Sequence, residues 1–163
     1  MGKTQPKLAE LDPVWAKIRS EAEAAVQDEP LLGAFLHKNV LQQVTIENAL
    51  AHRISLKLAS LEMSEQYLRE FCNRAFADDK TLAASARADI MATYDRDPAC
   101  HRFLQPLLYF KGFQAVQAYR IAHFMWTSGQ RDIAYFMQSR VSEVFGIDIH
   151  PNAKIGQGLM IDH

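Results

Sequence analysis

The sequence predicts a mainly α-helical protein: a bundle of several helices that is followed by the opening of a β-helix built on a hexapeptide repeat. Two observations predict this fold class. Apolar residues recur at helical spacing in successive segments up to residue 145, and each segment is bounded by capping residues, glycine or proline. After Gly146 the helical spacing gives way to an aliphatic residue at every sixth position. We therefore divide the chain into two domains, residues 1–146 and residues 147–163.

The first two helices are predicted from proline. Residues 1–11 are polar and we expect them to be frayed. Asp12 is a good N-cap because its side chain can accept a hydrogen bond, and Pro13 suits the first helical position, where no N–H is needed. The stretch Asp28-Glu29-Pro30 predicts a second start of the same kind.

Three further helices are predicted to begin at Thr45, Ser64 and Thr81, each of which precedes apolar residues at helical spacing. The last of these should end before Pro98, because the residue ahead of a proline avoids the helical region. Residues 94–98 are then a turn rich in charged side chains.

Two more helices complete the predicted bundle. One covers residues 112–128, with Gly129 as its C′ residue, and the other covers residues 131–145, with Gly146 as its stop. The simplest function of such a domain is to hold copies of the chain together in an oligomer.

The C-terminal segment, residues 147–163, has Ile149, Ile155 and Ile161 at six-residue intervals, with glycines between the last two. This is the period of a β-helix, in which each short strand places one aliphatic side chain inward. A strand, a glycine turn and a second strand would give the same pattern. Because a β-helix coil buries its apolar face only by stacking on neighbours, we expect this segment to be disordered or paired with another chain.

Composition excludes several classes of function. Hydrophobic residues make up 48% and charged residues 23% of the 163, which is typical of a soluble globular domain. The net charge of -1 predicts no nucleic-acid partner, and no apolar run is long enough to cross a membrane. The two cysteines, Cys72 and Cys100, lack metal-ligand spacing and fit free thiols in a reducing cytoplasm. Cys72 should pack in the core, and a catalytic thiol is the alternative.

The common catalytic motifs are absent. No two of the six histidines form a zinc-binding pair on a helix, so we expect no metal site. One carboxylate and one histidine remain, Asp148 and His163, which flank the six-residue repeat. Their separation is slightly short of one β-helical coil, so they could meet on adjacent levels roughly 4.8 Å apart. Asp148 would orient the imidazole and leave its other nitrogen as a general base, although a turn aspartate and an exposed histidine explain the residues equally simply.

The chain resembles the serine O-acetyltransferases. The segments that carry the resemblance are R-D-P-A at 96–99, P-L-L-Y-F-K-G-F-Q-A-V-Q-A-Y-R-I-A-H at 106–123, Q-S-R-V-S at 138–142 and D-I-H-P-N-A-K-I-G-Q-G-L-M-I-D-H at 148–163. The resemblance implies an N-terminal helical domain followed by a left-handed parallel β-helix.

The resemblance also implies a reaction, in which acetyl passes from acetyl-CoA to the hydroxyl of L-serine. His163 matches the catalytic histidine and Asp148 its aspartate partner, while Asp97 and Asp162 match carboxylates that hold the serine amino group. Without the resemblance, Asp97 could simply close a turn and Asp162 could be a solvated strand-end residue.

The implied partners are L-serine, acetyl-CoA as a co-substrate rather than a bound cofactor, and L-cysteine as a feedback inhibitor. The family forms trimers and hexamers, and many members bind O-acetylserine sulfhydrylase through a C-terminal tail. Both that tail and most of the acetyl-CoA cleft lie beyond the position that His163 matches, so we expect these 163 residues to be a truncated chain with negligible activity alone. The alternatives are a non-catalytic oligomerisation or regulatory module and another hexapeptide-repeat acetyltransferase.

Overall fold

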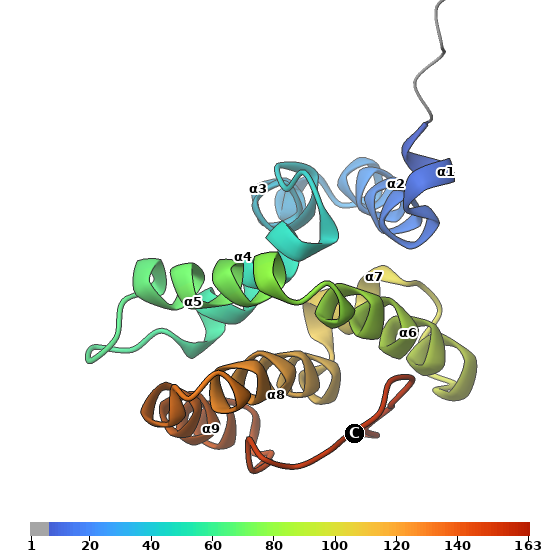
Figure 1. Ribbon diagram of the computed structural model, residues 1–163. Helices are drawn as coiled ribbons and strands as arrows, with labels where there is room; N and C mark the ends of the chain where they lie inside the picture. Colours follow the sequence, from blue (N-terminus) through green and yellow to red (C-terminus); the bar gives the residue numbers. More distant parts are fainter. Residues whose placement is uncertain (1–6) are drawn as a thin grey trace, which may run out of the picture.

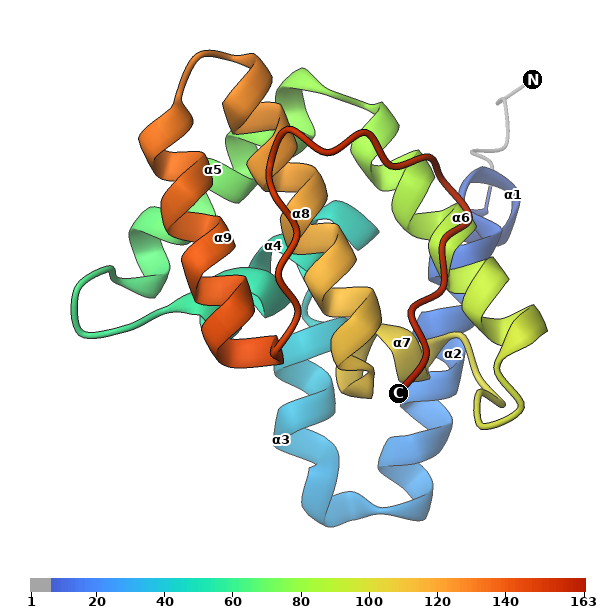
Figure 2. The same ribbon diagram turned by 90° about the horizontal axis from the view of Figure 1, so that it is seen from below.

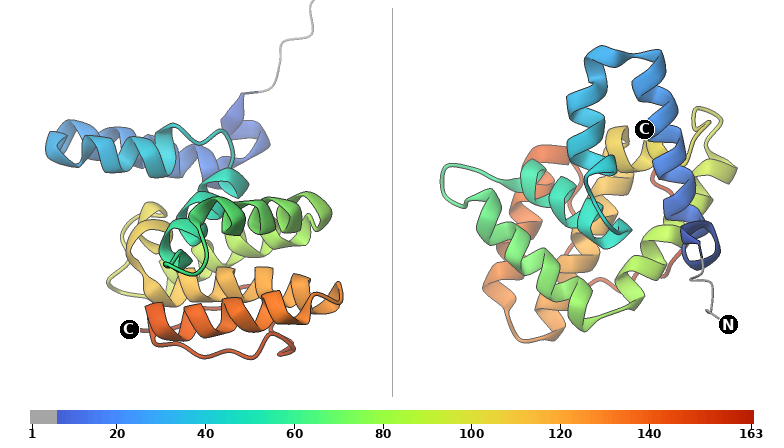
Figure 3. Two further views of the ribbon diagram at one scale, coloured as in Figure 1. Left: turned by 90° about the vertical axis from the view of Figure 1, so that its left-hand side faces the viewer. Right: turned by 90° about the horizontal axis from the view of Figure 1, so that it is seen from above.

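The computed structural model describes residues 7–163, and within that range the regular structure is entirely helical. The helices lie in three layers, with the C-terminal segment on the outer face of the third (Figures 1 and 3). The first layer contains α1 (Leu8–Leu11), α2 (Pro13–Asp28), the 3₁₀ turn η1 (Pro30–Leu32), α3 (Gly33–Leu36) and the π-helical turn η2 (His37–Leu41). The second contains α4 (Ile46–Leu58), α5 (Glu65–Asp78), α6 (Thr81–Arg96) and α7 (Leu104–Tyr109), and the third contains α8 (Lys111–Thr127) and α9 (Arg131–Phe145).

The predicted helix ends are confirmed where a side chain caps them. Asp12 accepts a hydrogen bond from the backbone N–H of Trp15 at 3.1 Å, at the start of α2. Thr45 and Ser64 cap α4 and α5 in the same way. At the other end of a helix, Gly146 follows α9 with a φ of 69°, the left-handed conformation that glycine adopts without strain.

Four details differ from the prediction. The turn expected at residues 94–98 begins later, because α6 continues to Arg96. The helix expected after Pro30 consists of three short pieces, η1, α3 and η2, and the side chain of Asn39 donates to the carbonyl of Phe35 within them. Helix α7 was not predicted, because six residues are too few to establish a period. Of the stretch expected to be frayed, residues 8–11 form α1, and residues 1–6 lie outside the described residues.

Helix α8 lies at the centre of the fold. Every residue from Gly112 to Ile121 is buried, including Gln114, Gln117 and Arg120. A helix buried on all sides needs polar partners for such residues, and α8 finds them in neighbouring elements. Both cysteines are buried and unpaired, and Cys72 lies in the apolar core, which confirms core packing for that thiol. Burial raises the pKa of Cys72 to about 12.

The C-terminal segment is ordered against the helices. It leaves the end of α9, turns near the end of α8 and returns between α8 and α6 toward α7 (Figure 2). The expectation that it is disordered is therefore wrong, and the reason is that side chains of α6 and α8 bind its backbone groups. Pairing of the segment with another chain stays a prediction. Across residues 7–163, no helix is both long and apolar enough to span a bilayer.

Candidate active site

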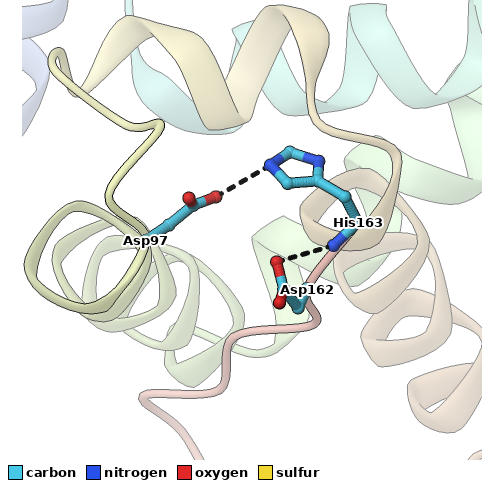
Figure 4. A group of neighbouring side chains, drawn as sticks. All are labelled: Asp97, Asp162 and His163. Carbon is cyan, nitrogen blue, oxygen red and sulfur yellow. Dashed lines mark hydrogen bonds and ion pairs between the residues drawn. The ribbon is translucent and has the colours of Figure 1, made fainter.

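Three of the four predicted site residues meet at the end of the C-terminal segment. Figure 4 shows Asp97, at the end of α6, facing Asp162 and His163. Their ligand atoms all lie within 4.8 Å of one another. Asp97 and the adjacent pair Asp162 and His163, which follows it 65 positions later, thus form one cluster of two carboxylates and an imidazole.

Asp97 is fixed by the way in which α6 ends. It is the C-cap residue, and its backbone N–H still donates to the carbonyl of Thr93 at 2.9 Å. Pro98 prevents the helix from continuing, and the chain turns. The side chain closes this turn, with Oδ1 accepting from the N–H of Ala99 at 2.8 Å, and the residue is only 5% exposed. Its Oδ2 is left to face His163.

His163 lies between a buried carboxylate and solvent. Its Nε2 is 3.0 Å from Oδ2 of Asp97, and the edge of its ring meets Phe110 at a centroid distance of 5.1 Å. Its side chain is nevertheless 57% exposed, and Asp162 accepts a hydrogen bond from its backbone N–H. The site is therefore an open, negatively charged corner in which one imidazole nitrogen points at a carboxylate.

This donor set suits a cationic group. Two carboxylates can hold an ammonium group by charge-assisted hydrogen bonds. A neutral imidazole beside them can accept a proton from a hydroxyl on the same molecule. Within residues 7–163, this cluster therefore combines two carboxylates suited to a cation with an imidazole that can accept a proton.

Asp148, the fourth predicted residue, lies elsewhere. Its Oδ1 accepts a hydrogen bond from Nε2 of Gln138, on α9, at 2.8 Å. His163 instead faces Asp97. The structure therefore does not bring Asp148 and His163 together as the β-helical spacing predicted.

Sequence reasoning missed a polar network beneath the C-terminal segment, which we call the Asp89–Arg120 network. Asp89 of α6 and Arg120 of α8 form a buried ion pair, with Nη2 of Arg120 2.9 Å from Oδ2 of Asp89. Gln117 donates to the same carboxylate oxygen at 2.8 Å. The available signal was the presence of charged residues at positions where the helical pattern is otherwise apolar.

The network also binds the backbone of the C-terminal segment. The N–H groups of Gly158 and Leu159 both donate to Oδ1 of Asp89, at 2.8 and 2.9 Å. In the opposite sense, Nη2 of Arg120 donates to the carbonyl of Gly156 at 2.8 Å. Backbone groups that would pair with neighbouring strands in a β-helix are here satisfied by two side chains.

A row of contacts along α8 holds the rest of the segment. The hydroxyl of Tyr119 donates to the carbonyl of Ala153, and Nδ1 of His123 lies 2.7 Å from the carbonyl oxygen of Pro151. Near the start of α8, a Cβ on Gly112 would lie 2.7 Å from the carbonyl oxygen of Ile161, so only glycine lets the segment approach so closely. These contacts place Ile161 directly before the site.

The fold and the site define a helical domain whose C-terminal segment ends in a cluster of two carboxylates and an imidazole. A family model described as "Serine acetyltransferase, N-terminal" matches residues 14–118. The serine acetyltransferase of Salmonella typhimurium is 46% identical over 154 residues, which are 94% of this chain and 56% of that protein.

Solved structures of serine acetyltransferases are also similar to this chain. The serine acetyltransferase of Brucella abortus in complex with coenzyme A has a TM-score of 0.89 at 43% identity, over 94% of this chain and 61% of the other. A serine acetyltransferase in complex with cysteine has a TM-score of 0.88 at 39% identity, over 90% and 61%. The chain belongs to the serine acetyltransferase family, and it spans about half the length of the curated bacterial relative.

Proposed function

We propose that this chain is the N-terminal part of a serine O-acetyltransferase, which transfers acetyl from acetyl-CoA to the hydroxyl of L-serine in cysteine biosynthesis. The observation that supports this most directly is the convergence of Asp97, Asp162 and His163, in a chain that belongs to this family. An amino acid with a hydroxyl side chain offers both groups that the cluster suits, an ammonium and an alcohol.

The proposed roles follow from the geometry. The ammonium group of serine binds between Asp97 and Asp162 and replaces Nε2 of His163 at Oδ2 of Asp97, so that Nε2 is free to accept the proton of the serine hydroxyl. His163 takes the hydroxyl proton as the serine oxygen forms a bond with the thioester carbonyl carbon of acetyl-CoA. The carbon–sulfur bond then breaks, and the departing CoA sulfur takes the proton from His163. Acetyl-CoA is a co-substrate in this scheme, and no bound cofactor or metal takes part.

Asp148 has a role only in the continued β-helix. We propose that the C-terminal segment, residues 147–163, opens a left-handed parallel β-helix and that residues 1–146 form the helical oligomerisation and substrate-site domain. Stacked coils would supply other partners for the segment, and Asp148 would then exchange Gln138 for the imidazole of His163. In that position it orients the ring and stabilises the imidazolium ion.

The proposed partners follow the family. We infer a homo-oligomer, a trimer or a hexamer, with L-cysteine as a feedback inhibitor in the serine site; the structure of a relative in complex with cysteine supports the latter. O-Acetylserine sulfhydrylase is the proposed protein partner. Two free, buried cysteines support a cytoplasmic location, in which thiols stay reduced.

The test compares three acceptors with the protein as its gene encodes it, with release of the CoA thiol as the measurement. L-Serine should be acetylated. N-Acetyl-L-serine, which keeps the hydroxyl and lacks the ammonium group, should not be. Equal turnover of both would contradict the role of the carboxylates, and a preference for L-homoserine would favour another hexapeptide-repeat acetyltransferase.

A further inference from the structure

The Asp89–Arg120 network has more donors than an ion pair between two helices requires. The Asp89 carboxylate is 0% exposed and accepts hydrogen bonds from both Nε and Nη2 of Arg120, from Gln117 and from two backbone N–H groups. A buried carboxylate needs such partners to remain charged. Two of them, Gly158 and Leu159, belong to the C-terminal segment, so the carboxylate is fully satisfied only when that segment is in place.

The network binds the segment on both sides of a tight turn. Gly158 has a φ of 76°, a left-handed conformation that glycine adopts without strain, and it lies in a bend at residues 157–158. Arg120 holds the carbonyl of Gly156 before this turn, and Asp89 holds the N–H groups of Gly158 and Leu159 at and after it. Arg96 adds a bond from α6 to the carbonyl of Gly158 at 2.9 Å. The backbone is therefore fixed only three residues before Asp162.

Helix α6 connects the network to the candidate active site. Asp89 lies within α6, and Asp97 caps its C-terminal end eight residues later. Eight residues of α-helix span about 12 Å. Because a helix of this length is stiff, the position at which Asp89 holds the segment sets where His163 arrives relative to Asp97.

Stability alone does not account for this arrangement. Buried ion pairs contribute little net stability compared with apolar side chains of the same size. The bonds from the network to residues 156–159 add nothing to the packing of α6 against α8, which Asp89 and Arg120 already join directly. They do determine the path of the chain toward the site.

We propose that Asp89 and Arg120 are positioning residues, which hold the turn at residues 156–159 so that Asp162 and His163 meet Asp97. The role in catalysis rests on the proposed function, whereas the role in fixing the segment does not. Neither side chain touches the reacting groups, and both act through the backbone that leads to His163.

The experiment uses three variants of the protein as its gene encodes it. Asp89→Asn keeps the shape of the side chain and replaces one acceptor oxygen by an NH2 group, which then faces donors in either orientation: Arg120 and Gln117 at the position of Oδ2, or the N–H groups of Gly158 and Leu159 at the position of Oδ1. Arg120→Lys keeps the charge but lacks the planar guanidinium group, which binds Asp89 and the carbonyl of Gly156 at the same time. This variant tests the proposal if Asp89→Asn does not fold. The matched control is Arg87→Gln, which breaks an ion pair with Asp12 that is also made from α6 and does not involve the C-terminal segment.

Two readouts separate positioning from general stability. Hydrogen exchange of the peptide containing residues 156–163 should accelerate at least about tenfold in both network variants and remain at the parent rate in Arg87→Gln. The kcat/KM for L-serine should fall about tenfold to a hundredfold, the effect expected for a misplacement of about 1 Å, while the KM for acetyl-CoA stays at the parent value.

Each outcome decides the proposal. Parent-like exchange in Asp89→Asn and Arg120→Lys would overturn it, as would faster exchange with an unchanged kcat/KM for serine. If Arg87→Gln changes exchange and kcat/KM as much as the network variants do, the network only stabilises the fold, and this result also contradicts the proposal. If the parent protein does not acetylate serine, the proposed function fails, and hydrogen exchange alone decides whether the network fixes the segment.

Discussion

The helical body, residues 7–146, and the C-terminal segment are held in place by different interactions. The body has a continuous apolar core to which α2, α4, α5, α6, α8 and α9 all contribute. In the C-terminal segment only Pro151 is buried, and the backbone is bound by polar side chains of α6 and α8. Apolar burial is strong and tolerant of small shifts, whereas hydrogen bonds are weak and directional.

This difference separates stability from function. The body supplies most of the free energy of folding, because that is where apolar surface is removed from water. The segment contributes His163 and Asp162, whose proposed roles in catalysis depend on position, since a misplacement of about 1 Å can lower the rate about a hundredfold. Substitutions in the two regions should therefore alter different measurements.

The largest effect is expected from His163→Ala. Loss of a general base reduces kcat by about a hundredfold to ten-thousandfold, and the melting temperature should not change because the side chain is mostly exposed. Steady-state release of CoA and a thermal melt measure the two quantities. His150→Ala, a histidine of the same segment that packs against Trp126, is the control and should keep parent kcat. Equal losses in the two variants would contradict the role of His163.

The opposite behaviour is expected from Leu50→Ala in the body. Leu50 is 1% exposed on α4, and truncation of such a core leucine costs about 2–5 kcal/mol of unfolding free energy. Chemical denaturation should show this loss, and kcat measured below the transition should be unchanged. Leu56→Ala, at a 48% exposed position of the same helix, should cost less than about 0.5 kcal/mol. A fall in kcat for folded Leu50→Ala would show that the two regions are coupled through the core.

The sequence predicts the body well because apolar periodicity and capping residues are local signals. Asp12, Thr45 and Ser64 cap the helices that they were expected to cap, and α9 has its predicted bounds. Helix α7 was not predicted because it is short and contains Pro106. A π-helical turn such as η2 has no sequence signature that distinguishes it from an α-helix.

The candidate site was predictable only in part. The resemblance brought out Asp97, Asp162, His163 and Asp148, and the structure places the first three together. Spacing suggested that Asp148 meets His163, and it does not, because that inference assumed stacked β-helical coils and the described residues contain none. Asp89 and Arg120 were missed because their importance comes from a contact between residues about 30 apart, which no local pattern contains.

A smaller effect is expected from Gly112→Ala, which tests whether the C-terminal segment can be displaced without a loss of stability in the body. The new Cβ would lie 2.7 Å from the carbonyl oxygen and 3.0 Å from Cβ of Ile161, so the segment must move. Alanine favours a helix over glycine, so the body should be as stable as the parent or slightly more stable. We expect kcat/KM for serine to fall about tenfold, with faster hydrogen exchange at residues 159–163.

Gly33→Ala is the matched control for this substitution. Its new Cβ would find only Cγ1 of Val26, at an ordinary 3.9 Å, and it faces no part of the C-terminal segment. It should leave both kcat/KM and exchange of residues 159–163 at parent values. Unchanged exchange in Gly112→Ala would mean that the segment does not depend on close approach to α8.

The smallest expected effect is a pH dependence of the stability of the helical body. Burial would raise the pKa of Asp12, but hydrogen bonds from Arg87 and from the N–H of Trp15 outweigh it and hold the pKa below its usual value. Because the pKa is lower in the folded state, the charge of Asp12 stabilises the fold above the unfolded-state pKa, near pH 4, and this contribution disappears as the pH falls through the folded-state pKa. Asp12→Asn keeps the helix cap and removes the charge.

Asp12→Asn should therefore cost about 0.5–1 kcal/mol at pH 7 and nothing once the carboxyl of the parent is protonated. Melts of parent and variant between pH 2 and pH 7 measure this difference. Arg87→Gln removes the same ion pair together with a weaker contact of Arg87 with Glu47 at 3.8 Å, so the double variant should be little less stable than Arg87→Gln alone. A stability difference between the parent and Asp12→Asn that persists unchanged to pH 2 would contradict the lowered pKa of Asp12. Exchange of residues 156–163 should stay at the parent rate throughout, because the ion pair between Asp12 and Arg87 stabilises the body without touching the segment that positions His163.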